Sequence, residues 1–540
     1  MQDPYEFCRC GSGKKNRWCC APLEVEIDKA WRQASMGQHE GALRTLDTLA
    51  AENKENPEVF GRKAELLFAL GRHPEAESSL EKAFALRADY PFGNYLKAAV
   101  LHDQGEMAGA LILARKSLDA YHPAAVGPLT RVLHLIFTGE MAQNRPIAAR
   151  VALKMILKLD STAAEPKQLF EEQFGPNSGL CEAAKRDYSL LPPPATRERQ
   201  TAWNKAAKTL GGGRLSGMAK MFEELTASDK NDTAAWFNMA LTQAMTGNNA
   251  KALEALERYF QLESDEGRLI VATGLSIVLR CGNGLEQKSD FLDHLFLLPA
   301  RDPNKLIPFI QKLMEEKQFL PFPRQPEEQG ITGFLLKPLS ALLVAGDNTP
   351  QYAHILGSLN ASPGALQLRT FDAKAGSELA HSARQALGLA INEGKNLLVG
   401  NLSDPFRDLA VVNLTANTDE IALKAKQGEN VKSFITEKWT TTPLKILGDK
   451  SPKQAITTPL GRALTLGLIK YIEGAKSLVT DFGFDSNGLK GLLGLGGEAQ
   501  KTIASPTQTV PAEDDATSLH QAFRDARHHD RHEDAAQLAT

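Results

Sequence analysis

A 34-residue period in the N-terminal part of the chain is the feature that most constrains its fold. Glycines recur at this interval, and a small residue follows each of the first three glycines by five positions. These residues are Gly37, Gly71, Gly105 and Gly139, with Ala42, Ala76 and Ala110. A helix–turn–helix unit explains the pattern, because glycine ends the first helix and the small residue lies where two helices cross closely. Residues 23–162 are therefore predicted to form a stack of helix pairs rather than one compact core.

This period resembles the tetratricopeptide repeat (TPR), whose consensus places Gly at the turn and Ala five residues later. The fourth copy departs from it, because the small residue after Gly139 is Ala149, which implies about five extra residues near positions 144–146. The resemblance implies a protein-interaction scaffold that holds a peptide on the concave surface formed by the first helix of each pair.

A second block of TPR-like sequence is predicted over residues 199–267, after a proline-containing connector at 163–198. Its matching positions, in order, are Trp236, Met239, Ala240, Gly247, Ala252, Leu256 and Tyr259. The resemblance implies that Asn238 is a clamp for a peptide backbone, because that groove position often carries Asn; a solvated helix residue is the alternative. The sequence leaves open whether the two blocks form one continuous superhelix.

Four of the six cysteines lie within the first twenty residues, as a C-x-C pair and a C-C pair separated by eight residues. They are Cys8, Cys10, Cys19 and Cys20. Zinc prefers four soft ligands in a tetrahedron, and two close cysteine pairs joined by a tight turn can supply them. Gly11 and Gly13 allow the sharp turn after the first pair. A knuckle this short cannot bury a core, so the metal would supply most of its folding free energy.

The segment Cys-x-Cys-Gly-Ser-Gly-Lys-Lys followed by Cys-Cys resembles the SEC-C motif, a zinc-binding element found at the C-terminus of the translocase motor SecA. The match covers residues 8–20, and Cys20 takes the place that is His in many members. The resemblance implies a basic contact element for a chaperone or the ribosome, with Lys14, Lys15 and Arg17 as candidate contact residues. A zinc-stabilised fold with no partner is the alternative interpretation.

Composition narrows the classes of protein that remain. A net charge of −3 and a pI near 6.5 argue against a chain that coats nucleic acid along its length. No stretch is apolar for the roughly 18 residues that a membrane-spanning helix needs, and the first residues do not have the composition of a signal peptide. The expected location is therefore a reducing cytoplasm, where clustered cysteines more often bind metal than form disulfides.

Residues 268–483 show no period and are predicted to be mainly helical, with helices over 267–280, 304–317 and 459–474. Two apolar runs, at 396–400 and 408–413, fit either short strands or helix segments. A pattern of Trp439 followed by spaced prolines and leucines is faintly similar to the toxin-binding domain of Xre/MbcA/ParS-type antitoxins, with a plain helix-packing corner as the alternative. Residues 484–540 have the composition of a disordered tail.

The fold class predicted from these patterns is mainly α: a short N-terminal zinc knuckle at 1–22, a TPR α-solenoid, and a largely helical C-terminal domain with a possible small sheet. No nucleotide-binding, nucleophile-elbow or metalloprotease motif occurs, so the chain is predicted not to be an enzyme, although an activity without such a motif in residues 268–483 is left open. The predicted function is a cytoplasmic, zinc-binding TPR adaptor. The alternatives are a ribosome- or nucleic-acid-associated factor that uses the basic knuckle, and a regulatory binder that acts through the C-terminal domain.

Overall fold

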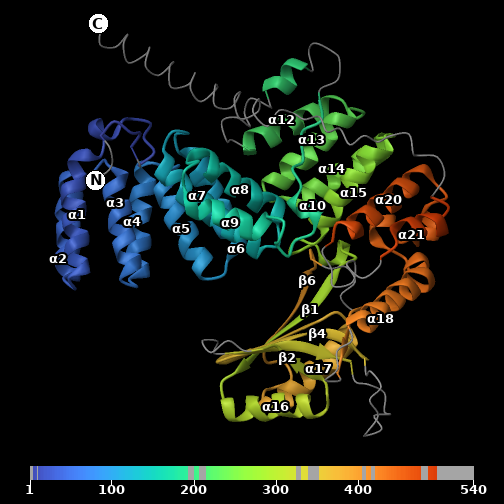
Figure 1. Ribbon diagram of the computed structural model, residues 1–540. Coiled ribbons are helices and arrows are strands. Elements are labelled where there is room, and N and C mark those ends of the chain that lie inside the picture. The colour runs from blue at the N-terminus through green and yellow to red at the C-terminus, as the bar shows by residue number, and fades with distance from the viewer. Residues whose placement is uncertain are drawn as a thin grey trace.

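The repeat array forms an elongated arm of antiparallel helix pairs at the N-terminal end of the molecule (Figure 1). The computed structural model describes residues 4–8, 10–192, 200–205, 215–323, 330–337, 352–403, 409–414, 420–475 and 484–495. The first block consists of α1 (Ala21–Ser35), α2 (His39–Glu52), α3 (Pro57–Ala69), α4 (His73–Leu86), α5 (Pro91–Asp103), α6 (Met107–Ala120), α7 (Val126–Ala142) and α8 (Pro146–Leu159).

The turns and small residues of the 34-residue period have the structural roles that the sequence predicts for three of the four copies. Gly37, Gly71 and Gly105 adopt φ of 77°, 71° and 80° between the two helices of their pairs. In the fourth copy Gly139 lies inside α7, and Asn144 takes the left-handed turn position with φ 54°. The extra residues therefore lengthen α7 rather than the turn, and asparagine replaces glycine because its short polar side chain tolerates this conformation.

The second block packs directly against the end of the first, because α8 contacts both the connector and the TPR helix over residues 233–245. This region contains α9 (Ala164–Phe174), α10 (Glu182–Lys185), α12 (Leu215–Ser228), α13 (Thr233–Met245), α14 (Asn249–Leu262) and α15 (Glu266–Arg280). Asp232, Asn248 and Asp265 accept backbone hydrogen bonds at the starts of α13, α14 and α15. Ala252 and Leu256, predicted at the helix crossing, are fully buried.

A seven-stranded antiparallel sheet follows the repeats, in the order β2-β3-β4-β5-β1-β6, with β7 paired to β4. The elements are β1 (Leu292–Ala300), α16 (Pro303–Glu315), β2 (Phe319–Pro321), β3 (Ile331–Leu336), β4 (Tyr352–Ser362), β5 (Gly364–Thr370), α17 (Ala373–Leu387), β6 (Lys395–Gly400) and β7 (Val411–Asn413). Helices α16 and α17 cover one face, onto which Phe296, Leu298 and Ala300 of β1 point. The small sheet is confirmed, both apolar runs contain strands, and strands β1 to β5 were not foreseen.

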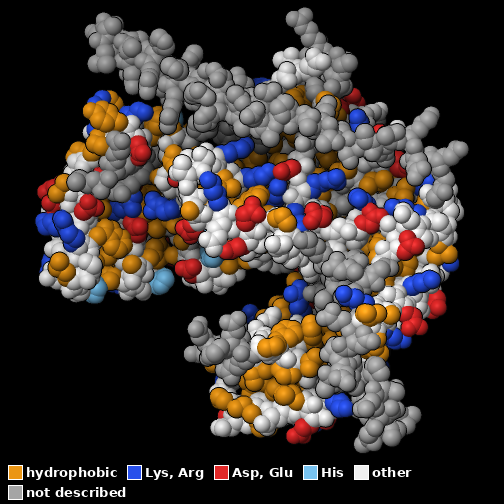
Figure 2. Space-filling model, viewed as in Figure 1, with side chains coloured by type: hydrophobic (Ala, Val, Ile, Leu, Met, Phe, Trp, Pro, Cys, Tyr) orange, Lys and Arg blue, Asp and Glu red, His pale blue; other side chains and the backbone are white. Residues whose placement is uncertain are grey.

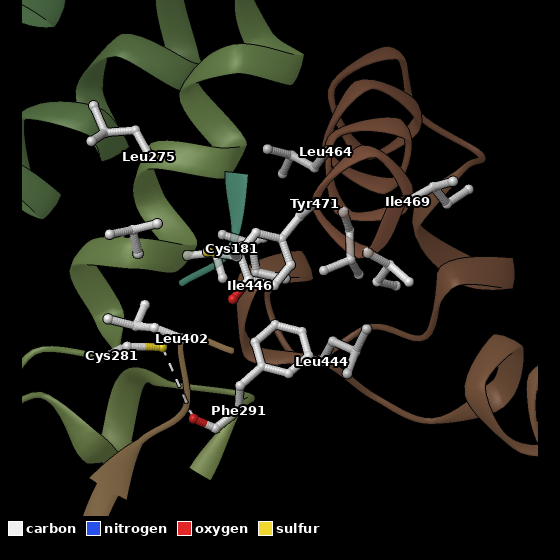
Figure 3. Packing of buried hydrophobic residues seen from close by; sticks show 14 of the residues in the cluster. Cys181, Leu275, Cys281, Phe291, Leu402, Leu444, Ile446, Leu464, Ile469 and Tyr471 are labelled. Atoms are coloured by element: carbon white, nitrogen blue, oxygen red, sulfur yellow. Dashed lines mark hydrogen bonds between the residues drawn. The ribbon is translucent and has the colours of Figure 1, made fainter. Parts of the chain in front are cut away.

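The C-terminal helices complete a core that also includes α15 and the connector (Figure 3). These helices are α18 (Glu420–Ser433), α19 (Pro452–Ala455), α20 (Pro459–Glu473) and α21 (Ser486–Leu492). Cys181, Cys281 and Tyr471 meet in this core, and both cysteines are buried apolar residues, as expected. Residues 484–495, assigned to the tail from composition, instead form α21 and bury Leu489 in the same core; the rest of the predicted tail lies outside the described residues.

One contact joins the arm, the second block and the sheet, and we call it the joint. The Asn144 Nδ2 group donates to the carbonyl oxygens of Cys281, at 2.6 Å, and of Gly400, at 2.8 Å. The Asn283 amide donates to the Gln143 carbonyl at 3.0 Å. Apart from the joint, the described strands lie away from the arm, and Figure 2 shows a hollow between them.

Candidate metal centre and its contacts with the repeats

The four N-terminal cysteines come together in one cluster. Their sulfur atoms all lie within 4.8 Å of one another, and Cys8, Cys10 and Cys20 are buried while Cys19 is half-buried. The Cys10 and Cys19 sulfurs are 3.5 Å apart, and those of Cys19 and Cys20 are 3.7 Å apart. Four thiolates bound to zinc at about 2.3 Å would have sulfur–sulfur distances of about 3.8 Å, and these two separations are close to that value.

The turn between the cysteine pairs is built by glycine and backbone hydrogen bonds. Gly11 and Gly13 have φ of 76° and 77°, values that favour glycine because it has no Cβ. The Cys8 amide donates to the Lys14 carbonyl at 2.8 Å, and the Gly11 amide donates to the Cys8 carbonyl at 3.0 Å. This local ladder brings the C-x-C pair back toward the C-C pair at the start of α1.

Buried polar side chains hold the cluster from outside the cysteines. Asn16 is fully buried; its Oδ1 lies 3.4 Å from the Cys8 sulfur, and its Nδ2 donates to Glu24 at 3.0 Å. Asn56, which caps α3, places its Nδ2 3.9 Å from the Cys20 sulfur. Such groups orient metal ligands and limit their motion. Sequence reasoning missed both residues, although an asparagine within the basic stretch was the available signal for Asn16.

The four thiols perturb one another because their sulfurs are so close. Hydrogen bonds from neighbouring thiols, that of Cys10 first, hold the pKa of Cys19 far below its ordinary value. The pKa of Cys20 is raised, chiefly because Cys10 and Cys19 beside it compete for the negative charge. Without a cation, four thiolates in this space would repel one another, whereas a divalent metal ion stabilises all four.

The knuckle lies against the loops between the helix pairs of the first block. Arg87, after α4, donates to the Cys10 carbonyl at 3.3 Å, and Phe7 stacks on His122 with ring centroids 3.5 Å apart. A Cβ on Gly11 would lie 2.3 Å from Cγ of Pro91, the first residue of α5. A cleft of about 710 Å³ opens beside this contact, and Cys10, Cys19 and Arg87 line it. The sequence did not predict this contact, because the residues are more than 70 positions apart.

The basic residues of the knuckle differ in their surroundings. Lys14 is exposed, whereas the Lys15 ammonium lies 3.8 Å from the centroid of the Phe7 ring. The Arg17 guanidinium contacts two aromatic rings, with centroid distances of 4.6 Å to Tyr5 and 3.6 Å to Trp18. Both rings are exposed, Tyr5 by 66% and Trp18 by 58%. Lys14 and Arg17 with these two rings therefore form a basic, aromatic surface beside the four-cysteine cluster.

The other two candidate residues are buried, and one of them requires a correction. Trp439 is only 4% exposed and packs within the core around α15 and α20, so it cannot serve as an exposed platform, and its segment is a packing corner. Asn238 is completely buried in α13 and is not a solvated helix residue. Its side chain forms hydrogen bonds with the backbone of Leu191 in the connector.

Comparisons with known proteins identify the repeats. Residues 33–100 match the family model of the tetratricopeptide repeat, and no curated protein matches the chain. The similar solved structures include YrrB, described as a TPR protein with an unusual peptide-binding site, at 18% identity over 42% of this chain and 95% of that chain, with a TM-score of 0.20. A TPR protein from Parabacteroides merdae is 16% identical over 46% of this chain and 84% of that chain, with a TM-score of 0.22. The TPR domain of P58(IPK) is 14% identical over 49% of this chain and 97% of that chain, with a TM-score of 0.17.

At such TM-scores these likenesses carry no weight, and the repeat architecture rests on the helix pairs, their turns and their buried small residues. Among the described residues no helix is both long and apolar enough to cross a membrane. The chain therefore carries TPR-type repeats, by the family match over residues 33–100 and by its helix geometry beyond them.

Proposed function

We propose that this chain is a non-enzymatic, zinc-binding TPR adaptor of the cytoplasm that holds a protein partner. One observation carries the proposal: the four-cysteine cluster contacts the loops of the repeat stack. The helix pairs of that stack leave an extended surface. Repeat stacks of this kind bind partners through such surfaces, because each repeat contributes only a small part of a long contact area.

In this proposal Cys8, Cys10, Cys19 and Cys20 hold one zinc ion as thiolates, and zinc supplies folding free energy rather than reactivity. Four protein ligands leave no open coordination position for a substrate, which is typical of a structural site. The residues of the chain then have two tasks: Asn16 and Asn56 orient the sulfurs, and Arg87 with Pro91 fixes the knuckle against the repeats.

Metal analysis of the purified full chain tests the zinc assignment. The double variant Cys8→Ser/Cys19→Ser should lose about one metal equivalent per chain relative to the unchanged protein. Ser12→Ala is the matched control, because its hydroxyl lies 3.2 Å from the Cys19 sulfur without being a ligand in the proposed set. Equal zinc content in the double variant and the control would refute the assignment.

Crosslinking in the native cell, followed by capture of the full chain, tests the adaptor role. A specific partner should be crosslinked to residues of the repeats or the knuckle, and its recovery should fall when the cysteine ligands are replaced. If recovery and crosslink positions are unchanged in the cysteine double variant, the knuckle takes no part in holding the partner. If no protein is crosslinked above the level of an unrelated control, the adaptor role itself is wrong.

A second candidate function is favoured by the basic, aromatic surface of the knuckle. Exposed lysine and arginine bind phosphates, and exposed aromatic rings stack on bases, so this surface fits ribosomal or other RNA. Binding of a labelled RNA to the full chain should then weaken with salt and be lost in Lys14→Glu/Arg17→Glu. The matched control is Lys29→Glu/Arg32→Glu on α1, which changes the charge equally outside this surface. Equal RNA binding by the two variants would contradict the RNA interpretation.

A further inference from the structure

Side chains of the second block form hydrogen bonds with the backbone of another segment of the same chain. Asn238 accepts a hydrogen bond from the Leu191 amide at 2.7 Å and donates one to the Leu191 carbonyl oxygen at 2.9 Å. Trp203 donates its indole N–H to the same carbonyl at 3.0 Å. An asparagine side chain that pairs with both the N–H and the C=O of one residue recognises an extended backbone irrespective of the side chain there.

We call residues 187–192 the strap. The strap has no helix or strand of its own, and Tyr188, Leu190 and Leu191 are half-buried while its other residues are exposed. Its first residue, Asp187, forms ion pairs with Arg150 and Lys154 of α8. Partial burial opposes ionisation of this carboxyl, but hydrogen bonds from both cations outweigh it and lower its pKa to about 2. Asp187 is thus charged at neutral pH and anchors one end of the strap at the surface.

Adjacent leucines supply the apolar part of the contact. Leu190 packs against a small cluster contributed by α8, α12 and α13, which includes Met155, Phe222 and Met239. Leu191 packs on the neighbouring core that contains Phe237. The strap therefore makes the contacts of a bound peptide: an electrostatic anchor, two aliphatic side chains in apolar surroundings, and a clamped backbone between helices.

We infer that this is a peptide-binding site, which the strap fills in cis until an extended partner segment with two adjacent large aliphatic residues displaces it. Covalent connection gives the strap a high effective concentration, so a partner must compete with it. The partner's apparent affinity then falls in proportion to the fraction of molecules in which the site is open. The inference rests on the proposed adaptor function and specifies which site the partner enters and what chemistry it presents.

Peptide binding to the full chain tests this site. The probe is a fluorescent peptide with the sequence of residues 186–192, and the control peptide carries serine at both leucine positions. The protein with a weakened strap is Leu190→Ser/Leu191→Ser, and Asn238→Ala is added to it to remove the clamp. Circular dichroism and zinc content establish that each variant keeps the rest of its fold.

The weakened strap should lower the Kd of the probe at least tenfold relative to the unchanged protein, because the site opens. Adding Asn238→Ala should abolish that gain, and the serine peptide should not bind. A folded variant with the weakened strap that binds the probe no better than the unchanged protein would overturn the inference. Equal binding with and without the Asn238 side chain would overturn it as well.

Hydrogen exchange of the unchanged protein provides a second test that no folding defect of a variant can confuse. Saturating probe should speed exchange of the Leu191 amide, because that amide leaves Asn238, while amides of α3 and α4 remain unaffected. Unchanged exchange at Leu191 would show that the strap is a fixed part of the core. If exchange at Leu191 is unchanged but the chain still holds zinc and its crosslinked partner, the proposed adaptor function stands. Only the inference of a cis-occupied site is then wrong.

Discussion

The contact between the knuckle and the repeats can be measured with two alanine substitutions that differ only in their surroundings. Gly11 and Gly13 have nearly the same left-handed φ, of 76° and 77°. A Cβ on Gly13 would meet no atom within 4 Å, whereas a Cβ on Gly11 would lie 2.3 Å from the ring of Pro91. Gly13→Ala therefore reports backbone strain alone, and Gly11→Ala reports strain plus separation of the knuckle from α5.

The expected magnitudes follow from these contacts. Placing alanine in the left-handed region costs about 1–2 kcal/mol, which is the whole effect expected for Gly13→Ala. At Gly11 the knuckle must also move away from Pro91. That movement weakens the hydrogen bond from Arg87 to the Cys10 carbonyl, worth about 0.5–1.5 kcal/mol, and the stacking of Phe7 on His122, worth a similar amount. Gly11→Ala should thus cost about 2–5 kcal/mol in total.

Hydrogen exchange of the amides in residues 4–20 of the full chain reports this opening free energy directly. Gly13→Ala should speed exchange by about 5- to 30-fold and Gly11→Ala by about 30- to 4,000-fold, since each 1.4 kcal/mol corresponds to a factor of ten. Only Gly11→Ala should also speed exchange at the start of α5. If the two variants exchange at the same rate within a factor of two, the knuckle does not rest on Pro91.

Three further substitutions, two of them with a matched control, test the joint, a buried ion pair and the last described helix. Asn144→Gly keeps the left-handed turn but removes the hydrogen bonds to the carbonyl oxygens of Cys281 and Gly400, so it should destabilise the C-terminal region by about 1–3 kcal/mol in urea unfolding. Unchanged stability would mean that the joint is dispensable. Arg62→Met leaves the buried carboxylate of Glu58 without its cation and should cost about 3–5 kcal/mol of folding stability. The control Lys63→Met removes a more exposed ion pair and should cost no more than about 1 kcal/mol. Equal losses of thermal stability would contradict this prediction. Leu489→Ala removes a buried side chain and should cost about 2–5 kcal/mol of folding stability. Leu492→Ala, at a half-exposed position, should cost about 0.5 kcal/mol or less. A similar small effect of both substitutions would place α21 outside the core.

Local patterns made the repeats predictable, because a turn glycine and a buried alanine act within one helix pair. The same reasoning placed the fourth turn at Gly139, and the structure moves it to Asn144, since asparagine can replace glycine at a left-handed position. Strand β1 was not predicted because its sequence does not alternate between apolar and polar residues. Its less buried face carries leucines and a proline, so both faces are largely apolar. Gly467 was likewise unremarkable in sequence, although a Cβ there would lie 2.5 Å from Thr273 of α15.

In the candidate site, too, only the features marked by local spacing were predictable from the sequence. Spacing alone predicted that the four cysteines lie together, because two close cysteine pairs joined by a short turn can meet in one cluster. The groups that position the knuckle, Arg87 and His122, belong to loops brought near only by stacking of the repeats. Asn238 was singled out by its helix position, yet its bond to Leu191 spans 47 residues and carries no signal in either segment alone. Trp439 misled because aromatic residues punctuated by prolines occur in buried corners as well as on surfaces.

The joint also bears on the order in which the chain folds during synthesis. Each helix pair of the first block contacts mainly its neighbours, so the arm can form progressively as its residues emerge. The hydrogen bonds of Asn144 are made with residues 137 and 256 positions later, and such long loops close slowly. The Cys281 acceptor is present once α15 has been made, whereas the Gly400 acceptor is absent until β6 has been made. The contact that fastens the sheet to the arm is thus expected to form after the arm itself, at the turn where the regular glycine of the repeat has been replaced by asparagine.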